Sequence, residues 1–137
     1  MRSIESGAHV ICVMNGQPAR RVTDLVVWRL AHELTLGVYQ MTGTFPKWEL
    51  YALGDQMRRA SVSVPANIAE GFRKRTQREK LRYLNIAEAS LEELKYYLLL
   101  AQDLGYAKTQ ELTQLGGRVE LYIARYAGAI RAKAEAA

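Results

Sequence analysis

The sequence predicts an all-α protein, an antiparallel up-down-up-down four-helix bundle. Two observations lead to this prediction. In four segments the apolar residues recur three and four positions apart, which places them on one face of a helix that turns once per about 3.6 residues. Short stretches with glycine or proline separate these segments, and helices joined by short turns bury such apolar stripes by packing side by side.

Length and composition are consistent with one globular domain. The chain has 137 residues, of which 49% are hydrophobic and 24% charged. Chains of this size form one core, and this composition argues against disorder. Residues 1–22 show no helical or strand periodicity and do not have the pattern of a signal peptide. We therefore expect a flexible N-terminal leader at residues 1–22 and a four-helix bundle domain at residues 23–137.

The first expected helix covers residues 24–41. Thr23 or Asp24 can cap it, because their side-chain oxygens accept hydrogen bonds from the unpaired N–H groups of a first helical turn. The segment TGTFPKW at residues 42–48 ends the helix, since glycine and proline both interrupt helices. The apolar stripe of this helix consists of Val27, Ala31, Leu34, Val38 and Met41.

The second expected helix begins near Glu49 and contains an internal proline, Pro65. Proline has no N–H group to donate and its ring collides with the preceding turn, so we expect the helix to kink or restart there. Helical spacing continues to Phe72, and Gly71 offers a C-terminal stop. The apolar stripe before and after the proline consists of Leu50, Leu53, Met57, Ala60, Val64 and Ile68.

The third and fourth expected helices are longer and more regular. TQRE at residues 76–79 has the form of a capping box, in which a threonine and a glutamate satisfy N–H groups at a helix start, and the third helix ends at Gly105. Thr109 is expected to cap the fourth helix, which continues to near Arg131. The third stripe consists of Leu84, Ala87, Leu91, Leu94, Leu98 and Ala101. The fourth stripe consists of Leu112, Leu115, Val119, Tyr122, Tyr126 and Ala129.

A second apolar strip makes the helices wider on their apolar side than one bundle seam requires. This strip consists of Trp28, Val62, Tyr83, Ile86, Tyr97, Leu100 and Ile123. Excess apolar width favours an interface between subunits. The alternative is a wide core stripe with scattered exposed tyrosines.

Three segments carry a family resemblance. DLVVWRLAHEL, GDQMRRASVSVPANIAEGF and YLNIAEASLEELKYYLLLAQDLGY, with the turn between the last two, resemble the four-helix-bundle proteins called 23S ribosomal RNA intervening-sequence proteins. The resemblance covers about residues 23–133. It implies a bacterial protein that assembles into a homopentamer. Similarity to a related accessory protein of diversity-generating retroelements implies two further partners, a nucleic acid and a reverse transcriptase.

The segment around Pro65 is predicted to hold a structural network of Arg58, Arg59, Asn67 and Glu70. Pro65 leaves one helix carbonyl without its usual donor, and the Asn67 amide or a guanidinium group can supply one. Glu70 can pair with Arg58 or Arg59. The catalytic alternative makes Glu70 a general base and the arginines anion clamps. No nucleophile, histidine or metal ligand accompanies Glu70 in this segment, so we expect no catalytic residues and no enzyme.

Metal and disulfide chemistry have little support in the sequence. His9 and Cys12 have the spacing of two metal ligands, but the only other histidine is His32 and no second ligand pair accompanies them. We therefore expect no metal site and no cofactor. Cys12 is the single cysteine, which excludes an internal disulfide, and no apolar run approaches the roughly 20 residues of a membrane span. The expected location is the cytoplasm.

Positive charge is concentrated between residues 73 and 83. Six basic residues there oppose one acidic residue, Glu79, so the segment has a net charge of +5, equal to the +5 of the whole chain. The six are Arg73, Lys74, Arg75, Arg78, Lys80 and Arg82. Clustered cations attract phosphate groups, and Phe72 or Tyr83 could stack on an unpaired base. The alternative is an ordinary solvated turn.

Three classes of function remain. An oligomeric, non-enzymatic protein that binds RNA or DNA, with structured RNA favoured, is the leading interpretation. An oligomeric scaffold or accessory protein whose partner is another protein, such as a reverse transcriptase, comes second. An enzyme is a distant third, because no residues in the sequence have catalytic spacing.

Overall fold

A computed structural model describes residues 18–136 of the chain, and every element in that range is helical. The four long helices are α2 (Val26–Thr42), α4 (Leu53–Arg73), α5 (Gln77–Asp103) and α6 (Gln110–Ala136). Two short helices accompany them, the 3-10 helix η2 (Val22–Asp24) and α3 (Lys47–Leu50).

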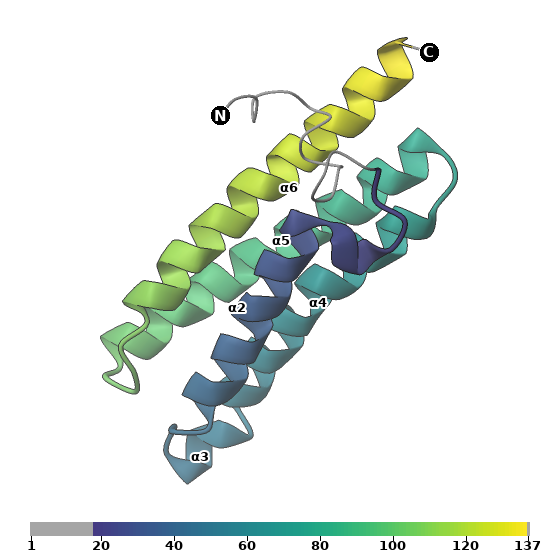
Figure 1. Cartoon of the computed structure of the whole chain (residues 1–137). Coiled ribbons are helices and arrows are strands. Elements are labelled where there is room, and N and C mark those ends of the chain that lie inside the picture. The colour runs from purple at the N-terminus through teal and green to yellow at the C-terminus, as the bar shows by residue number, and fades with distance from the viewer. Residues whose placement is uncertain (1–17, 137) are drawn as a thin grey trace.

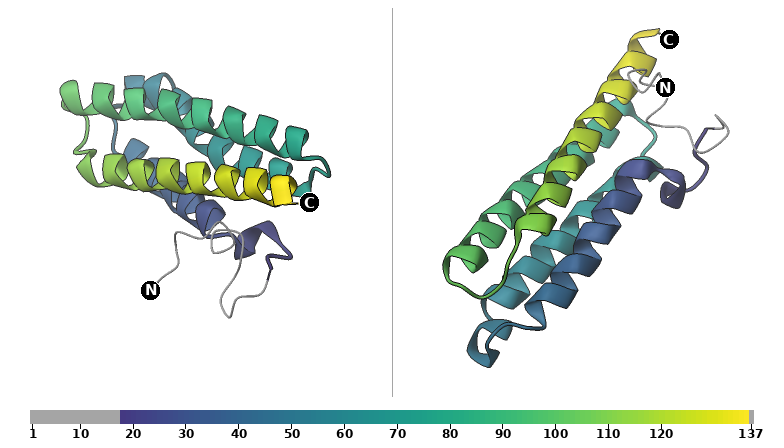
Figure 2. Two further views of the ribbon diagram at one scale, coloured as in Figure 1. Left: turned by 90° about the horizontal axis from the view of Figure 1, so that it is seen from above. Right: turned by 60° about the vertical axis from the view of Figure 1, so that its left-hand side comes forward.

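The four long helices pack into one bundle. α4 packs against α2 and α5, and α6 packs against α5 and α2, which closes a four-sided arrangement around one core. Figure 1 shows each long helix running back along the one before it, and Figure 2 shows the same arrangement from two other sides. The predicted all-α fold with four helices is confirmed.

Most residues of the predicted apolar stripes lie in the core, but Met41, Leu50, Leu112, Leu115 and Tyr122 are only partly buried. All six stripe residues of α5 are buried, because a strict heptad keeps them on one side of the helix. On α6, Ile123 is fully buried, although we assigned it to the outer strip, while Tyr122 is only half-buried. Val62 is the exposed member of that strip. The oligomer that the strip favours therefore stays a prediction.

The helix ends follow the sequence only in part. Thr76 caps α5 as predicted, since its hydroxyl accepts a hydrogen bond of 3.1 Å from the Glu79 N–H. The expected cap of α2 by Thr23 or Asp24 is wrong, because α2 begins after Leu25. Asp24 instead accepts hydrogen bonds of 3.1 Å from the N–H groups of Arg20 and Arg21, and these bonds hold its pKa below the usual value.

The connection between α5 and α6 also departs from the prediction. Gly105 ends α5 in the left-handed conformation at φ 78°, and the N–H of Tyr106 reaches back to the Ala101 carbonyl at 2.9 Å, the pattern of a Schellman cap. Thr109 does not cap α6 with its hydroxyl. Its side chain is buried and donates at 3.1 Å to the Leu98 carbonyl on α5, which fastens the turn to the preceding helix.

The second expected helix is divided into α3 and α4. Arg58 explains the division, because its guanidinium donates at 2.9 Å to the Leu50 carbonyl and at 3.1 Å to the Thr42 hydroxyl. The Leu50 carbonyl therefore has a partner without a continuous helix. α4 itself runs through Pro65 without a restart, and the kink at Pro65 stays a prediction.

Contacts with the core begin before the predicted domain boundary at residue 23. Ala19 and Val22 are partly buried and pack against the bundle. Residues 1–17 of the expected leader, with His9 and Cys12, lie outside the described residues.

Candidate nucleic-acid interface

The α4–α5 turn is tight because Gly71 lets the two helices approach closely. A Cβ atom at Gly71 would lie 3.1 Å from the Tyr83 Cβ and 3.2 Å from the Lys80 carbonyl oxygen. Gly71 is buried inside α4, which continues for two more residues, so its role is close approach rather than the predicted stop signal. The Lys74 N–H then bonds the Gly71 carbonyl at 3.2 Å and closes the end of α4.

Lys80 has mainly a structural role in this turn. Its Nζ donates to the Phe72 carbonyl at 2.8 Å, which the end of α4 leaves open, and adds a longer bond of 3.4 Å to the Gly71 carbonyl. A cation is favoured at that end of a helix dipole. Burial, and secondarily the charge of Lys133, lower the pKa of Lys80.

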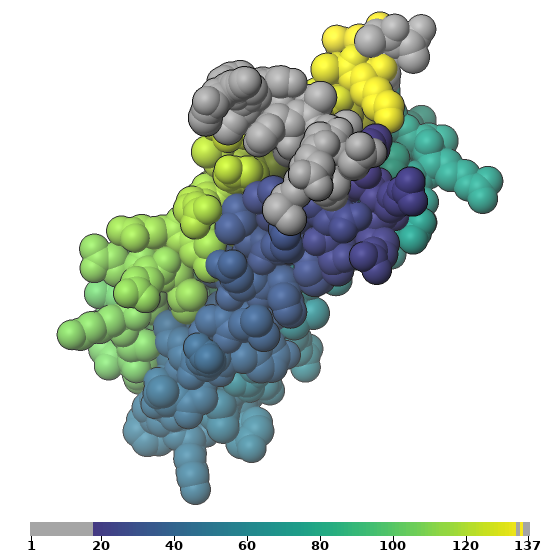
Figure 3. All heavy atoms as spheres, viewed as in Figure 1, coloured from purple at the N-terminus to yellow at the C-terminus, as the bar shows by residue number. Residues whose placement is uncertain are grey.

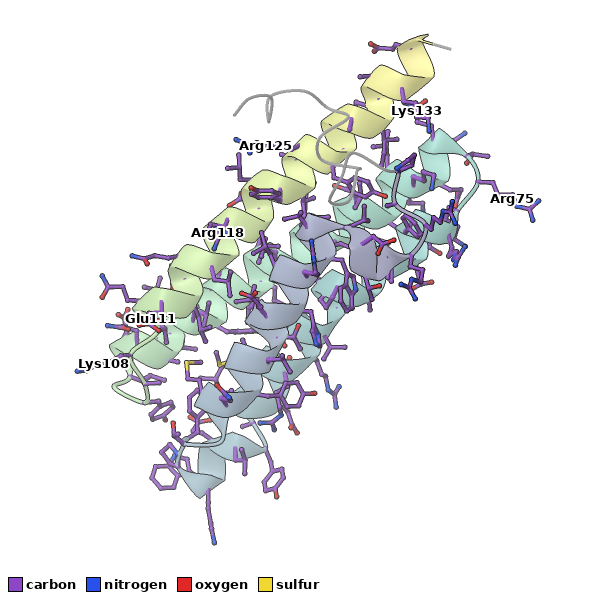
Figure 4. All side chains as sticks on the ribbon, in the orientation of Figure 1. Arg75, Lys108, Glu111, Arg118, Arg125 and Lys133 are labelled. Carbon is purple, nitrogen blue, oxygen red and sulfur yellow. The ribbon has the colours of Figure 1, made fainter. Side chains whose placement is uncertain are left out.

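Four of the six predicted cations are exposed, namely Arg73, Arg75, Arg78 and Arg82, and we call them the arginine cluster. Figure 4 shows Arg75 extending away from the bundle at the α4–α5 turn. Arg82 lies 3.7 Å from Glu79 but its side chain remains 61% exposed. Within residues 18–136 the other three have no ion pair. The cluster therefore presents positive charge to solvent with little local compensation.

The two aromatic rings beside the turn hold cations in place. The guanidinium of Arg73 lies 5.7 Å from the centre of the Phe72 ring. Lys74 and Arg82 lie 5.0 and 5.4 Å from the centre of the Tyr83 ring. Such contacts are attractive because the face of an aromatic ring is electron-rich. A base that stacked on Tyr83 would have to displace one of these cations.

The predicted network around Pro65 has a different composition. The Ser61 carbonyl, which Pro65 leaves without its helical donor, accepts a hydrogen bond of 2.8 Å from the Thr35 hydroxyl on α2. The expectation that Asn67 or an arginine is this donor is wrong. Asn67 instead donates to the Ser63 carbonyl at 2.8 Å and to the Ser63 hydroxyl at 3.0 Å.

The charged members of that network are also arranged differently. Arg58 forms an ion pair with Asp55, besides its two bonds to the end of α2 and to α3. Arg59 and Glu70 are exposed, and no ion pair joins Glu70 to Arg58 or Arg59 among the described residues. Of the four predicted network residues, Arg58 and Asn67 form side-chain bonds among the described residues, and Arg59 and Glu70 do not.

No feature of the described range has the geometry of a metal centre. Within residues 18–136 no three His, Cys, Asp or Glu side chains are grouped to hold a metal ion. His32 stacks on Trp28, with ring centres 5.0 Å apart. The same range contains no helix that combines the length and the apolar character of a membrane span.

Sequence reasoning missed Lys133 at this end of the bundle and Thr35 near Pro65, and it named Tyr126 only as a member of the apolar stripe of the fourth helix. Lys133, at the end of α6, lies at the same end of the molecule as the turn, as Figure 4 shows. Its place follows from the topology, since a fourth antiparallel helix ends beside the turn between the second and third. Tyr126 is buried there. Thr35 could have been found as a polar residue inside the apolar stripe of α2, between Leu34 and Val38.

Comparison with known proteins decides the family. The family model for 23S rRNA-intervening sequence proteins matches residues 23–126, well over half of the chain. The chain belongs to this family. The match includes Pro65 and the whole α4–α5 turn, and the last turns of α6 lie beyond it. No curated protein matches the chain.

Proposed function

We propose that this 23S rRNA-intervening sequence protein is a non-enzymatic protein that binds nucleic acid, with structured RNA favoured over DNA, through the arginine cluster. The observation that supports the proposal is the exposure of Arg73, Arg75, Arg78 and Arg82 at one end of the bundle. Each arginine can form two parallel hydrogen bonds with a phosphate, and each phosphate contact releases condensed counterions. Folded RNA suits such a surface because proteins recognise it largely by shape and backbone.

The six predicted cations divide into two roles under this proposal. The arginine cluster contacts phosphates. Lys80 holds the end of α4 and Lys74 packs on Tyr83, so both shape the turn. No catalytic residue and no cofactor take part, and the proposed location is the cytoplasm.

A homo-oligomer would multiply the binding surface, because each subunit adds a copy of the cluster. The resemblance favours a pentamer. Exposed apolar side chains that suit a subunit interface are Val62 at 42%, Tyr96 at 57% and Leu99 at 56% exposure. Light scattering should give several times the 15.5 kDa mass of one chain. A monomer at micromolar concentration would contradict this part of the proposal.

The second candidate function is an accessory protein whose partner is another protein, such as a reverse transcriptase. It is favoured by Trp48 and Tyr51 in and after α3, which are 75% and 77% exposed. Aromatic side chains are enriched at protein interfaces. Figure 1 places α3 at the end of the bundle opposite the α4–α5 turn, so this surface is separate from the arginine cluster.

A charge-matched pair of variants tests the leading proposal. Changing Arg73, Arg75, Arg78 and Arg82 together to glutamine should weaken binding of a folded RNA by at least about tenfold, because the phosphate contacts are lost. The control variant changes Arg29, Lys47, Lys108 and Arg118 to glutamine, which removes the same charge from exposed positions elsewhere. It should bind nearly as well as the parent. An equal loss of RNA affinity in both variants would show that binding depends on net charge and not on the arginine cluster. No loss of affinity in either variant would favour the protein-binding alternative.

A further inference from the structure

A cavity of about 390 Å³ opens at the same end of the bundle as the α4–α5 turn. Its apolar lining comes from three separate segments, with Ala19 before η2, Phe72 at the end of α4, and Tyr126 and Ile130 on α6. Figure 3 shows the start of the described chain (purple) beside the turn (teal), with the end of α6 (yellow) at the same end of the molecule. The volume falls at the small end of the range for ligand pockets, roughly 300–1,000 Å³.

Tyr126 lines this cavity with a hydroxyl that has no partner among the described residues. The residue is only 4% exposed, and its hydroxyl forms no hydrogen bond with any described residue. Burial alone raises its pKa to about 12. Buried tyrosine hydroxyls ordinarily have a hydrogen-bond partner, so this one is open to a polar atom of a ligand.

Three cations line the same cavity, Arg75, Lys80 and Lys133, and no acidic side chain among the described lining residues opposes them. The charge of Lys133 adds to burial in lowering the pKa of Lys80, which indicates that the two ammonium groups repel each other. A bound anion would relieve this repulsion and replace the water that burial removes from Lys80.

We propose that this cavity binds a small amphipathic anion, a medium-chain aliphatic or aromatic carboxylic acid. The apolar body would lie against Phe72 and Ile130. The carboxylate would pair with Lys80 and Lys133, and the Tyr126 hydroxyl would donate to a ligand oxygen. The lining combines apolar side chains with three cations and no described acidic side chain, which suits an anionic head group on an apolar body.

This inference does not rest on the proposed nucleic-acid binding, although Arg75 belongs to both the cavity lining and the arginine cluster. Lys133 and Tyr126 do not belong to the arginine cluster, and Lys133 lies beyond the range that the family model matches. Loss of RNA binding without loss of carboxylate binding, or the reverse, would separate the two proposals.

The test is calorimetric titration of the full chain with octanoate, 1-octanol and octylamine as probes. Octanoate should bind saturably at one site per chain, more tightly than octanol, and octylamine should not bind because the cavity is cationic. Changing Lys133 to glutamine should weaken octanoate binding about tenfold, as expected for a lost charge-assisted hydrogen bond. The matched control, Arg118→Gln on the exposed part of α6, should leave it unchanged.

A second variant and a second source of the anion complete the test. Tyr126→Phe should weaken octanoate binding about fivefold while leaving octanol binding in place, since a hydrogen bond to a charged group is lost. Lys133 is exposed, so Lys133→Gln keeps the proposal testable if Tyr126→Phe alters the fold. Equal binding of octanoate and octanol, no saturable binding, or an unchanged affinity in Lys133→Gln would overturn the proposal. Binding to anionic phospholipid vesicles without saturable octanoate binding would overturn it too.

Discussion

Two neighbouring parts of the chain, the segment around Pro65 and the α4–α5 turn, differ in whether their polar groups bond inside the protein or face solvent. Around Pro65 the polar groups bond inward, as when the Thr35 hydroxyl donates to the Ser61 carbonyl. At the turn, Arg73, Arg75 and Arg78 face solvent without an ion pair among the described residues.

This difference distinguishes residues that stabilise the fold from residues that form a candidate contact surface. A buried carbonyl without a donor destabilises the fold, so its partner is explained by stability alone. Exposed like charges next to one another repel each other, which slightly opposes folding. The hydrogen bonds around Pro65 are explained by stability, whereas the grouping of the arginine cluster is not, which is why we propose it as a contact surface.

Tyr126 is an exception to this comparison, because it is buried and its hydroxyl has no partner among the described residues. Its ionisation at alkaline pH should produce the largest change in stability. Burial raises its folded pKa to about 12, against an ordinary value of 10.0. The folded protein therefore holds this proton more tightly, and the stabilisation is complete below pH about 10 and lost as the pH rises through about 12. Urea unfolding at pH about 9 and about 12 should show the parent losing about 2 kcal/mol more than Tyr126→Phe, and equal losses would contradict the assignment.

Removing the donor near Pro65 should have an effect of similar size. Thr35→Val leaves the Ser61 carbonyl buried without a partner, which should lower the free energy of unfolding by about 1–3 kcal/mol. Thr113→Val on the exposed side of α6 is the control and should change it by less than about 0.5 kcal/mol.

A double variant sharpens that result. Pro65→Ala restores an N–H group that can bond the Ser61 carbonyl, so adding it should reduce the cost of Thr35→Val. Chemical denaturation of the single and double variants measures this coupling. A cost that is the same with proline and with alanine at position 65 would show that the carbonyl is not what Thr35 satisfies.

Smaller effects are expected for Asn67 and Glu70, two of the four residues that we assigned to the Pro65 network. Asn67→Ala loses two bonds to Ser63 and should cost about 1 kcal/mol. Glu70→Ala should change stability by less than about 0.5 kcal/mol, because Glu70 is exposed. Thermal melting of both variants ranks them, and the opposite order would restore the predicted role of Glu70.

The sequence predicted the fold well because apolar spacing alone determines which side of a helix is buried. It failed on α6, where Val119 is followed three residues later by Tyr122 and four residues later by Ile123. Both steps satisfy helical spacing, and only the placement of α6 against its neighbours selects Ile123 for the core. Periodicity therefore limits the choice to two residues without deciding between them.

The candidate site was predicted in outline and not in its contacts. The six cations were evident from the sequence, but the hydrogen bond from Lys80 to the end of α4 depends on how closely Gly71 lets α5 approach. Likewise, Pro65 revealed that one carbonyl lacks a donor, whereas the donor, Thr35, depends on the rotation of α2. Long-range side-chain contacts of this kind require the packed structure.

The most direct test of this division between architecture and contact surface is the salt dependence of RNA binding. In a plot of the logarithm of affinity against the logarithm of salt concentration, each phosphate contact contributes a slope of about −0.7 for a single strand. Changing Arg73, Arg75, Arg78 and Arg82 to glutamine should make the slope shallower by up to about 3, whereas Thr35→Val should leave it unchanged in conditions where it stays folded. An equal slope in the parent and the arginine variant would contradict the account.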